Sequence, residues 1–214
     1  PNVPGIESVG YLTSDSLWGL TELPRRLLVV GGGPIGCELA QAFCFLGSDV
    51  TLLEAGERIL PREDAEVSEY LRSVFSKDGM KIRTLVEIES FEVTGVEKSV
   101  RVRQSGATAR IVFDQVLIAT GREPNVKGFG LEALGVEINP NGAMAVDPFL
   151  RTSIPNIYAC GDVAGPYQFT HVAAHQAWFA SVNALFSPLK KFKIDYRVIP
   201  SATYTTPEVA GRNQ

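Results

Sequence analysis

The stretch between residues 27 and 54 constrains the fold more than any other part of the chain. Residues 27–30 form an uninterrupted apolar run, LLVV, which is typical of a strand buried on both faces. The glycine-rich residues 31–36, GGGPIG, come next, followed by a helical segment and a second strand-like run at residues 49–53 that ends at Glu54. A strand, a glycine turn, a helix, a second strand and an acid in this order predict a βαβ unit.

Each residue type in this unit suits a chemical task. Gly31 permits a tight turn out of the strand, Gly33 lets a diphosphate approach the backbone, and Gly36 lets the helix pack near the sheet. The N–H groups and the positive dipole end of the helix favour phosphates, and Glu54 is placed to accept ribose hydroxyl groups. We therefore predict a dinucleotide site, in preference to a purely structural βα turn, formed by Glu54 together with Gly31, Gly32, Gly33, Pro34, Ile35 and Gly36.

The identity of the dinucleotide depends on charges that follow the second strand. Arg58 and Arg62 could receive the 2′-phosphate of NADP. Glu54 would repel that phosphate, and Ala55 beside it carries no charge. The sequence therefore favours NAD over NADP.

Composition excludes several classes of partner. The formal net charge of −4 gives no basic surface for nucleic acid or for an anionic membrane. No apolar run approaches the ~20 residues that cross a bilayer, and the first residues lack a secretory signal pattern. The chain starts Pro-Asn-Val without Met, so we expect the central fragment of a longer protein; the cysteine content is consistent with a cytoplasmic one.

Three cysteines do not make a disulfide framework. Cys37 and Cys44 are predicted to lie two turns apart on one helix face, with Cα atoms roughly 10 Å apart, which is too far for a disulfide. We expect these two residues and Cys160 to be buried small apolar side chains in a reducing environment.

The remainder of the first half predicts an α/β fold with a parallel sheet, helices and an antiparallel three-stranded β-meander. Residues 62–77 have the spacing of an amphipathic helix that Gly79 ends. The expected strands are residues 80–85, then 91–94, 99–104 and 109–113 in the meander, and finally the apolar residues 115–119.

The second half has a looser texture and reads as part of a second domain of the same type. Residues 131–134 predict a helical turn, residues 143–146 and 157–159 predict short strands, and residues 192–204 are strand-like. Residues 171–186 predict a helix, whose inward-facing side chains we expect to be Val172, Ala173, Ala177, Ala180, Ala184 and Leu185.

Several motifs in a fixed order resemble one family, the flavin-dependent pyridine nucleotide–disulfide oxidoreductases of the mercuric reductase and dihydrolipoamide dehydrogenase type. The resemblance covers almost the whole chain. It is carried by GGGPIGCE (31–38), LLEAGERILPRED (52–64), LIATGREPN (117–125), PNIYACGD (155–162) and FTHVAAHQA (169–177).

The resemblance implies a domain organisation. Residues 1–23 would be the tail of a first FAD-domain segment, and residues 24–121 the NAD(P)-binding domain. Residues 122–189 would be the second FAD-domain segment, and residues 190–214 the start of a truncated dimerisation domain. The full-length protein would be a homodimer.

The resemblance also assigns residues on the nicotinamide dinucleotide side. Residues 31–36 would hold the pyrophosphate and Glu54 the adenosine ribose. Glu38 would lie near the nicotinamide, Val86 on the adenine side, and Gly121 close to the nucleotide. An alternative for Glu38 is that it only complements the dipole at the start of its helix.

On the flavin side, Asp162 would accept a hydrogen bond from a ribityl hydroxyl of FAD, unless it is merely a turn residue. The segment Gln168, Phe169, Thr170 and His171 would place backbone N–H groups beside the N1/O2 edge of the flavin, where a reduced flavin is anionic. His171 and His175 are spaced to share a metal, but no third ligand stands out, so no metal site is predicted.

The chain lacks three features of this family: an N-terminal FAD fingerprint, a C-x-x-x-x-C pair and a C-terminal His–Glu dyad. We therefore expect no catalytic residue in this chain and no activity from it alone. In the whole enzyme, hydride would pass from NADH to FAD and electrons would go on to a disulfide or a thiol-bound metal. The alternatives are a flavin-dependent NADH oxidoreductase without a disulfide and a non-catalytic NAD-binding sensor module.

Overall fold

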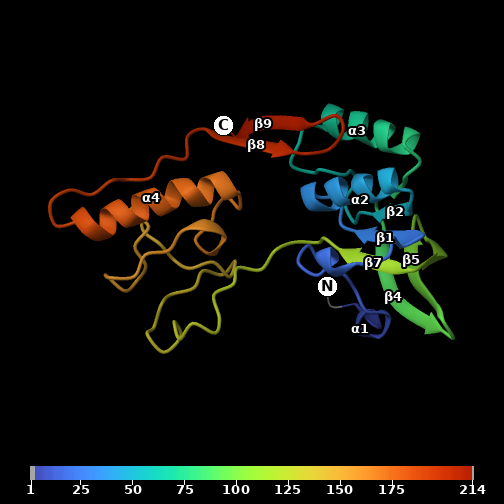
Figure 1. The fold of residues 1–214 in the computed structure, drawn as a ribbon, viewed down its shortest axis with the longest axis horizontal. Coiled ribbons are helices and arrows are strands. Elements are labelled where there is room, and N and C mark those ends of the chain that lie inside the picture. The colour runs from blue at the N-terminus through green and yellow to red at the C-terminus, as the bar shows by residue number, and fades with distance from the viewer. Residues whose placement is uncertain (1–2, 214) are drawn as a thin grey trace. The chain divides into compact units, whose positions relative to one another are not determined.

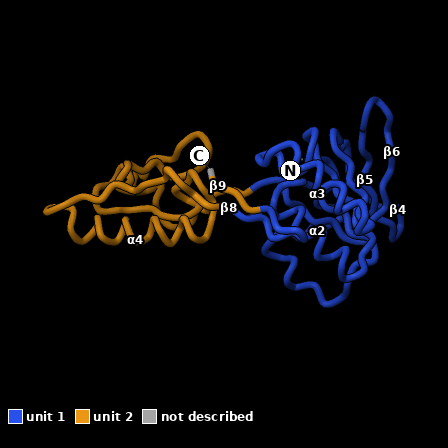
Figure 2. Tube along the Cα trace, turned by 90° about the horizontal axis from the view of Figure 1, so that it is seen from above, with its two compact units in different colours: residues 1–121, 202–209 blue, residues 122–201, 210–214 orange. Residues whose placement is uncertain are grey.

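The computed structural model describes residues 3–213, which fall into two compact units (Figure 2). Unit 1 takes the chain up to Gly121 together with Ala202–Val209. Unit 2 takes Arg122–Ser201 and the residues from Ala210 onward. No helix within the described residues is long and apolar enough to span a bilayer.

Unit 1 is built on a four-stranded parallel sheet with the strand order β3-β2-β1-β7 (Figure 1). The register pairs Val30 of the first strand with Leu53 on one side and with Ile118 on the other, so these three carboxyl ends are level. Leu28 and Val29 are fully buried, as the apolar run predicts. The strands are β1 (Arg26–Val30), β2 (Asp49–Leu53), β3 (Lys81–Arg83) and β7 (Gln115–Ile118).

Two helices cover one face of this sheet: α2 (Pro34–Leu46) and α3 (Ala65–Lys77). Leu71 and Phe75 of α3 pack with the β1 side chains that point to this face. The α3 helix begins three residues later than predicted, because Asp64 takes an extended N-cap conformation and the residues before it form a turn.

The antiparallel meander covers the other face, with Phe91 and Phe113 packed edge to face at 6.1 Å between ring centroids. Its strands are longer than the pattern predicts, because the turns contain only two residues each, 95–96 and 105–106. The residues on both sides of each turn pair directly across the hairpin. The meander strands are β4 (Glu87–Thr94), β5 (Glu97–Gln104) and β6 (Ala107–Phe113), and the N-terminal segment adds α1 (Ile6–Val9) and the 3₁₀ turn η1 (Leu17–Gly19).

Unit 2 has little regular structure apart from the 17-residue α4 (Thr170–Phe186) and the 3₁₀ turn η2 (Gly161–Val163). The predicted strands 143–146 and 157–159 are wrong. Only single bridges form there, between Ile138 and Met144 and between Arg151 and Tyr158. Residues 131–134, predicted as a helical turn, form a hydrogen-bonded turn in which the N–H of Leu134 donates to the carbonyl of Leu131 at 3.2 Å.

The buried stripe of α4 differs from the predicted one. Val172, Gln176, Ala180 and Asn183 are buried, whereas Leu185 is 73% exposed. Two polar residues occupy positions that a pattern based on hydrophobicity assigns to apolar side chains. Their amides are accepted in the interior because each is hydrogen-bonded.

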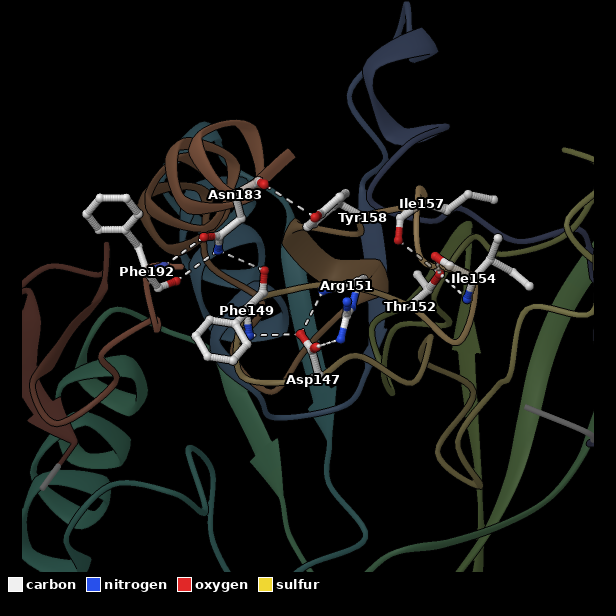
Figure 3. Close-up of polar contacts among 9 residues, drawn as sticks. All are labelled: Asp147, Phe149, Arg151, Thr152, Ile154, Ile157, Tyr158, Asn183 and Phe192. Carbon is white, nitrogen blue, oxygen red and sulfur yellow. Dashed lines mark hydrogen bonds and ion pairs between the residues drawn. The ribbon is translucent and has the colours of Figure 1, made fainter. Parts of the chain in front are cut away.

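Asn183 shows how such an amide organises unit 2 (Figure 3). Its Nδ2 donates to the carbonyls of Phe149 and Phe192, and its Oδ1 accepts the N–H of Phe192 at 2.8 Å. Nearby, the Asp147 carboxylate accepts the N–H groups of Phe149 and Arg151. Side-chain bonds thus support a region in which the backbone pairs only at single bridges.

The last segment contributes a two-stranded sheet, β8 (Ile199–Thr203) with β9 (Val209–Asn213). The loop between these strands belongs to unit 1 and is bound by α2. Gln41, which is 2% exposed, accepts the N–H of Thr206 and donates to its carbonyl at 2.8 Å. Within the broader region 192–204, predicted as strand, only the end is a strand.

Candidate functional site

The glycine loop lies at the carboxyl edge of the parallel sheet, between β1 and α2. Gly31 has φ 110°, and a Cβ at this position would lie 2.4 Å from the carbonyl oxygen of Ala119. A Cβ on Gly36 would lie only 1.9 Å from the carbonyl oxygen of Gly31. Neither position accepts a side chain, because the turn and the close approach of helix to strand leave no room.

Gly33 is different, because it borders open space. No atom lies within 4 Å of the position that its Cβ would take. Gly33 is the N-cap of α2 and has no side chain to cap the helix, and Pro34 fills the first helical position. The N–H groups of Ile35 and Gly36 belong to the first turn and have no intrahelical acceptor. An uncrowded loop with unpaired donors at a helix N-terminus fits a diphosphate.

Glu54 reaches from the end of β2 to the glycine loop. Its carboxylate accepts the N–H of Gly32 at 2.6 Å and the N–H of Gly56 at 2.7 Å. Each carboxylate oxygen can accept a second hydrogen bond, so both retain capacity for a hydroxyl donor. The role of Gly56 was not predicted, although its position two residues after the acid allows the return contact.

Val86 and its neighbour Leu85 lie at the same edge, after β3. The Val86 side chain is 4% exposed and packs in the core against the meander, and its N–H donates to the Glu54 carbonyl at 3.1 Å. Only its backbone carbonyl is left to meet a ligand. Leu85 has φ 56° and is 57% exposed, so it offers the accessible side chain here, which the sequence did not reveal.

Gly121 follows β7 at this edge of the sheet. It has φ 155° and is exposed, and no atom lies within 4 Å of its hypothetical Cβ.

Glu38 lies on α2, one residue past its first turn. Its Oε1 accepts the N–H of Tyr204 at 2.7 Å, from the loop that Gln41 also binds. The carboxylate is therefore bonded to another segment and does not cap its own helix. The carboxylate that we predict to lie near a nicotinamide is therefore the same group that accepts the Tyr204 N–H.

Arg58 and Arg62, the two candidates for a 2′-phosphate, differ in their surroundings. Arg62 is exposed, whereas Arg58 is half-buried and donates through Nη2 to the carbonyl of Pro61 at 3.3 Å. The Nε of Arg58 is buried and has no partner among the described residues. Arg58 is thus held by its own loop.

In unit 2, Asp162 lies in η2 and forms an ion pair with Arg122. One guanidinium nitrogen of Arg122 donates to Asp162 Oδ2 at 3.1 Å and to the carbonyl of Gln168 at 3.2 Å. A single side chain thereby joins the two segments that were predicted to meet a flavin. The sequence motif contains Arg122, but its partners are 40 or more residues away and could not be inferred locally.

Gln176 fixes the backbone just before Asp162. It is fully buried, accepts the N–H of Gly161 at 2.5 Å, and donates to the carbonyl of Gly165 and to the hydroxyl of Tyr196, both at 2.7 Å. Burial raises the pKa of Tyr196, so this hydroxyl stays protonated at neutral pH. Gln176 was not predicted as part of the site.

The start of α4 carries the other predicted flavin contacts. Phe169 is the N-cap and supplies no side-chain bond, so the N–H groups of Thr170 and His171 are available to a ligand. The His171 ring stacks on Phe169 and its Nε2 lies 2.9 Å from the carbonyl of Pro200. His175 packs against Phe179 instead. Among residues 3–213, no group of three potential metal ligands occurs.

All three cysteines are free, but only Cys37 is buried. The expectation of burial was wrong for Cys44 and Cys160, which are partly exposed. Desolvation, reinforced by the negative charge of Glu54, raises the pKa of Cys37 to about 12. This thiol is therefore not a nucleophile at neutral pH.

A βαβ unit with this loop, followed by a meander and a second unit, defines the class of FAD/NAD(P)-binding α/β folds. Residues 1–177 match the family model for pyridine nucleotide-disulphide oxidoreductases. The chain belongs to the pyridine nucleotide-disulphide oxidoreductase family.

Individual relatives agree with this assignment. A mercuric reductase of Bacillus cereus is 40% identical over 210 residues, covering 98% of this chain and 33% of that protein. A dihydrolipoyl dehydrogenase of Thermus scotoductus is 38% identical, covering 94% of this chain and 45% of the relative. The Cu(II) complex of the HOCl-induced flavoprotein disulfide reductase RclA from Escherichia coli is similar with a TM-score of 0.87 and 33% identity, over 98% of this chain and 47% of that one. The chain thus spans about a third to a half of the length of these proteins.

Proposed function

We propose that unit 1 binds a nicotinamide dinucleotide across the glycine loop. The observation that supports this most strongly is the position of Glu54, whose carboxylate bonds the Gly32 N–H at 2.6 Å beside the open space at Gly33. The first-turn N–H groups of α2 would hold the pyrophosphate. Glu54 would hold the adenosine ribose, the Val86 carbonyl would face the adenine, and Glu38 would lie near the nicotinamide.

The dinucleotide we propose is NAD rather than NADP. If Glu54 holds the ribose hydroxyls, a 2′-phosphate on that ribose would lie next to its carboxylate, and the two negative charges would repel. Arg58 could offset the repulsion only by leaving the Pro61 carbonyl. Arg62 is exposed, so a single ion pair between its guanidinium and the phosphate would contribute little to the binding free energy.

Unit 2 would supply part of an FAD site. Asp162 would accept a ribityl hydroxyl, and the N-terminus of α4, from Gln168 to His171, would face the N1/O2 edge of the flavin. A helix N-terminus stabilises negative charge there, which favours the reduced flavin. Arg122 and Gln176 would keep these two segments in place.

The whole protein would be a flavoprotein oxidoreductase that works as a homodimer. The bound cofactors supply the hydride chemistry, from nicotinamide to flavin and on to a disulfide or a thiol-bound metal ion. The residues of this chain bind and orient the cofactors and tune their charge, and none of them reacts. In this proposal residues 24–121 form the NAD(P)-binding domain, and residues 1–23 and 122–189 belong to the FAD domain.

Calorimetric titration of the protein with NADH, NADPH and FAD tests the proposal. We expect saturable NADH binding, weaker NADPH binding and little FAD retention, because these residues form only part of the flavin site. Glu54→Gln should weaken NADH binding at least about tenfold, because its N–H₂ group replaces one acceptor oxygen and then faces the N–H donor of Gly32 or of Gly56. The matched control is Glu57→Gln, an exposed acid of the same loop. Tighter binding of NADPH than of NADH, or equal binding by both variants, would contradict the proposal.

A further inference from the structure

A cavity in unit 1 lies between the parallel sheet and the last meander strand, on the face of the sheet opposite to α2 and α3. It has a volume of about 290 Å³ and is lined by residues 26–28 of β1, Asp49 and Thr51 of β2, Lys81 and Arg83 of β3, and residues 110–113 of β6. It extends along this face from Arg26, the first residue of β1, to Arg83, which ends β3 and pairs with Leu53 at the carboxyl edge. No residue predicted for the dinucleotide lines it.

The cavity exists because the meander covers only part of its face of the sheet. Val50, Leu52 and Ile82 point to the helices, so the alternate residues of β2 and β3 point to the meander side. There, Phe113 packs over the centre of the sheet with the apolar residues of β1. Lys81 and Arg83 of the edge strand β3 extend beyond that contact and line the cavity.

Four cationic side chains line this cavity, in a protein whose net charge is −4. Three of them have a carboxylate partner. The pairs are Arg26–Asp114 at 2.6 Å, Lys81–Asp49 at 2.7 Å and Arg110–Glu97 at 2.7 Å. The fourth cationic side chain forms no ion pair with a carboxylate among the described residues.

That fourth side chain is Arg83. Its Nε and Nη2 both donate to Gln104 Oε1, at 3.0 and 2.8 Å, and Gln104 Nε2 donates to the Thr84 carbonyl at 2.6 Å. The amide is thereby oriented with its oxygen toward the guanidinium. Among the described residues no carboxylate forms an ion pair with Arg83, although it is half-buried. A fixed guanidinium with a neutral partner and a remaining nitrogen favours an oxyanion.

The surroundings limit the size and chemistry of such a ligand. A volume of about 290 Å³ is at the lower end of ligand pockets, so a dinucleotide does not fit. The lining combines the cations with Leu28, Ile111 and Phe113, which suits a short carbon skeleton. The C-terminal ends of α2 and α3, which are negative, lie on the other face of the sheet.

We propose that this cavity is a binding site for a small organic anion with two or more negative charges, a phosphate ester or a polycarboxylate. Arg83 forms the principal contact, and Lys81 and Arg110 contribute by sharing their hydrogen bonds between the ligand and their carboxylate partners. No residue that we assign to the dinucleotide lines the cavity, so a separate set of side chains forms the anion site.

Calorimetric titration with citrate and with inorganic pyrophosphate at low ionic strength tests the proposal and separates a carboxylate from a phosphate ligand. We expect saturable binding of at least one anion, weakened at least about tenfold by Arg83→Gln. Lys127→Gln, at an exposed lysine of unit 2, should bind both anions like the wild type, and Gly33→Ala, whose change lies in the glycine loop, should bind citrate like the wild type. This last variant separates the site from the proposed dinucleotide function.

The absence of saturable binding of either anion to the wild type would overturn the proposal, and so would equal affinities of the wild type and Arg83→Gln. Loss of citrate binding in Gly33→Ala with wild-type citrate binding in Arg83→Gln would place the anion in the glycine loop and would also overturn it. Circular dichroism checks that Arg83→Gln is folded. If it is not folded, the anion affinities of Arg83→Lys and Lys81→Gln are measured instead and compared with that of Lys127→Gln. Equal affinities would overturn the proposal.

Discussion

Substitution of Gly33 by alanine separates binding at the glycine loop from stability. The new Cβ meets no atom within 4 Å, and φ −74° with ψ −178° is open to any residue. Alanine is a poorer N-cap than glycine by about 0.5–1 kcal/mol. The lower entropy of the unfolded chain offsets this by about 0.4–1 kcal/mol. The free energy of unfolding should therefore change by less than about 0.5 kcal/mol.

Binding should respond much more strongly to Gly33→Ala. The methyl group occupies the open space that a diphosphate needs in order to reach the N–H groups of Ile35 and Gly36. Loss of one hydrogen bond to a charged group costs about 1.5–3 kcal/mol, which is at least about a tenfold loss of NADH affinity. Titration followed by NADH fluorescence measures the affinity, and urea denaturation measures the free energy of unfolding.

Gly36→Ala is the matched comparison. Alanine gains up to about 1 kcal/mol in helix propensity, but its Cβ would lie 1.9 Å from the Gly31 carbonyl oxygen, and such overpacking costs about 1–3 kcal/mol. This variant should lose stability, whereas Gly33→Ala should not. The reasoning is refuted if a folded Gly33→Ala variant binds NADH like the wild type, or if Gly36→Ala is as stable as the wild type.

Three further predictions concern stability and reactivity. Arg26 holds the pKa of Asp114 below its ordinary 3.8, so the stabilisation is present above about pH 4 and is lost as the pH falls through the folded pKa. Asp114→Asn should thus lower the free energy of unfolding at pH 7, and the difference from the wild type should shrink toward pH 2; a constant difference in urea melts across this range would argue against the ion pair. Cys37, with its pKa raised to about 12, should react with a thiol reagent at pH 8 only after unfolding, and mass spectrometry that found it modified before Cys44 would contradict its burial. Gln176→Leu should destabilise the protein by about 2–3 kcal/mol, because it leaves buried polar groups unpaired; a smaller change than about 1 kcal/mol in denaturation would show that water replaces the amide.

The sequence predicted correctly those elements whose contacts lie between residues that are close together in the chain. The strand at Asp49–Leu53 was predicted to the residue, because an apolar run between a helix and an acid has few other solutions. The glycine loop is equally local: the close approach of Gly36 to Gly31 spans five residues and leaves a direct mark on the sequence. The family resemblance and the fold class that followed from these motifs were confirmed.

Predictions failed where contacts between distant residues determine the outcome. Leu185 was assigned to the buried side of α4, but the buried positions are taken by Gln176 and Asn183, whose partners are loops that no local pattern identifies. The ion pair between Arg122 and Asp162 was not predicted at all, because the two residues are 40 positions apart. Short apolar segments such as residues 157–159 failed as strands because no neighbour pairs with them over more than one residue.

The central claim is that the glycine loop of unit 1 binds a nicotinamide dinucleotide. Its most direct test is the change in the backbone amide resonances of ¹⁵N-labelled protein when NADH is added. The account predicts that the largest shifts fall on Gly32, Gly33, Ile35 and Gly36, with smaller shifts at Gly56. Saturable shifts confined to other residues, or none at millimolar NADH, would contradict it.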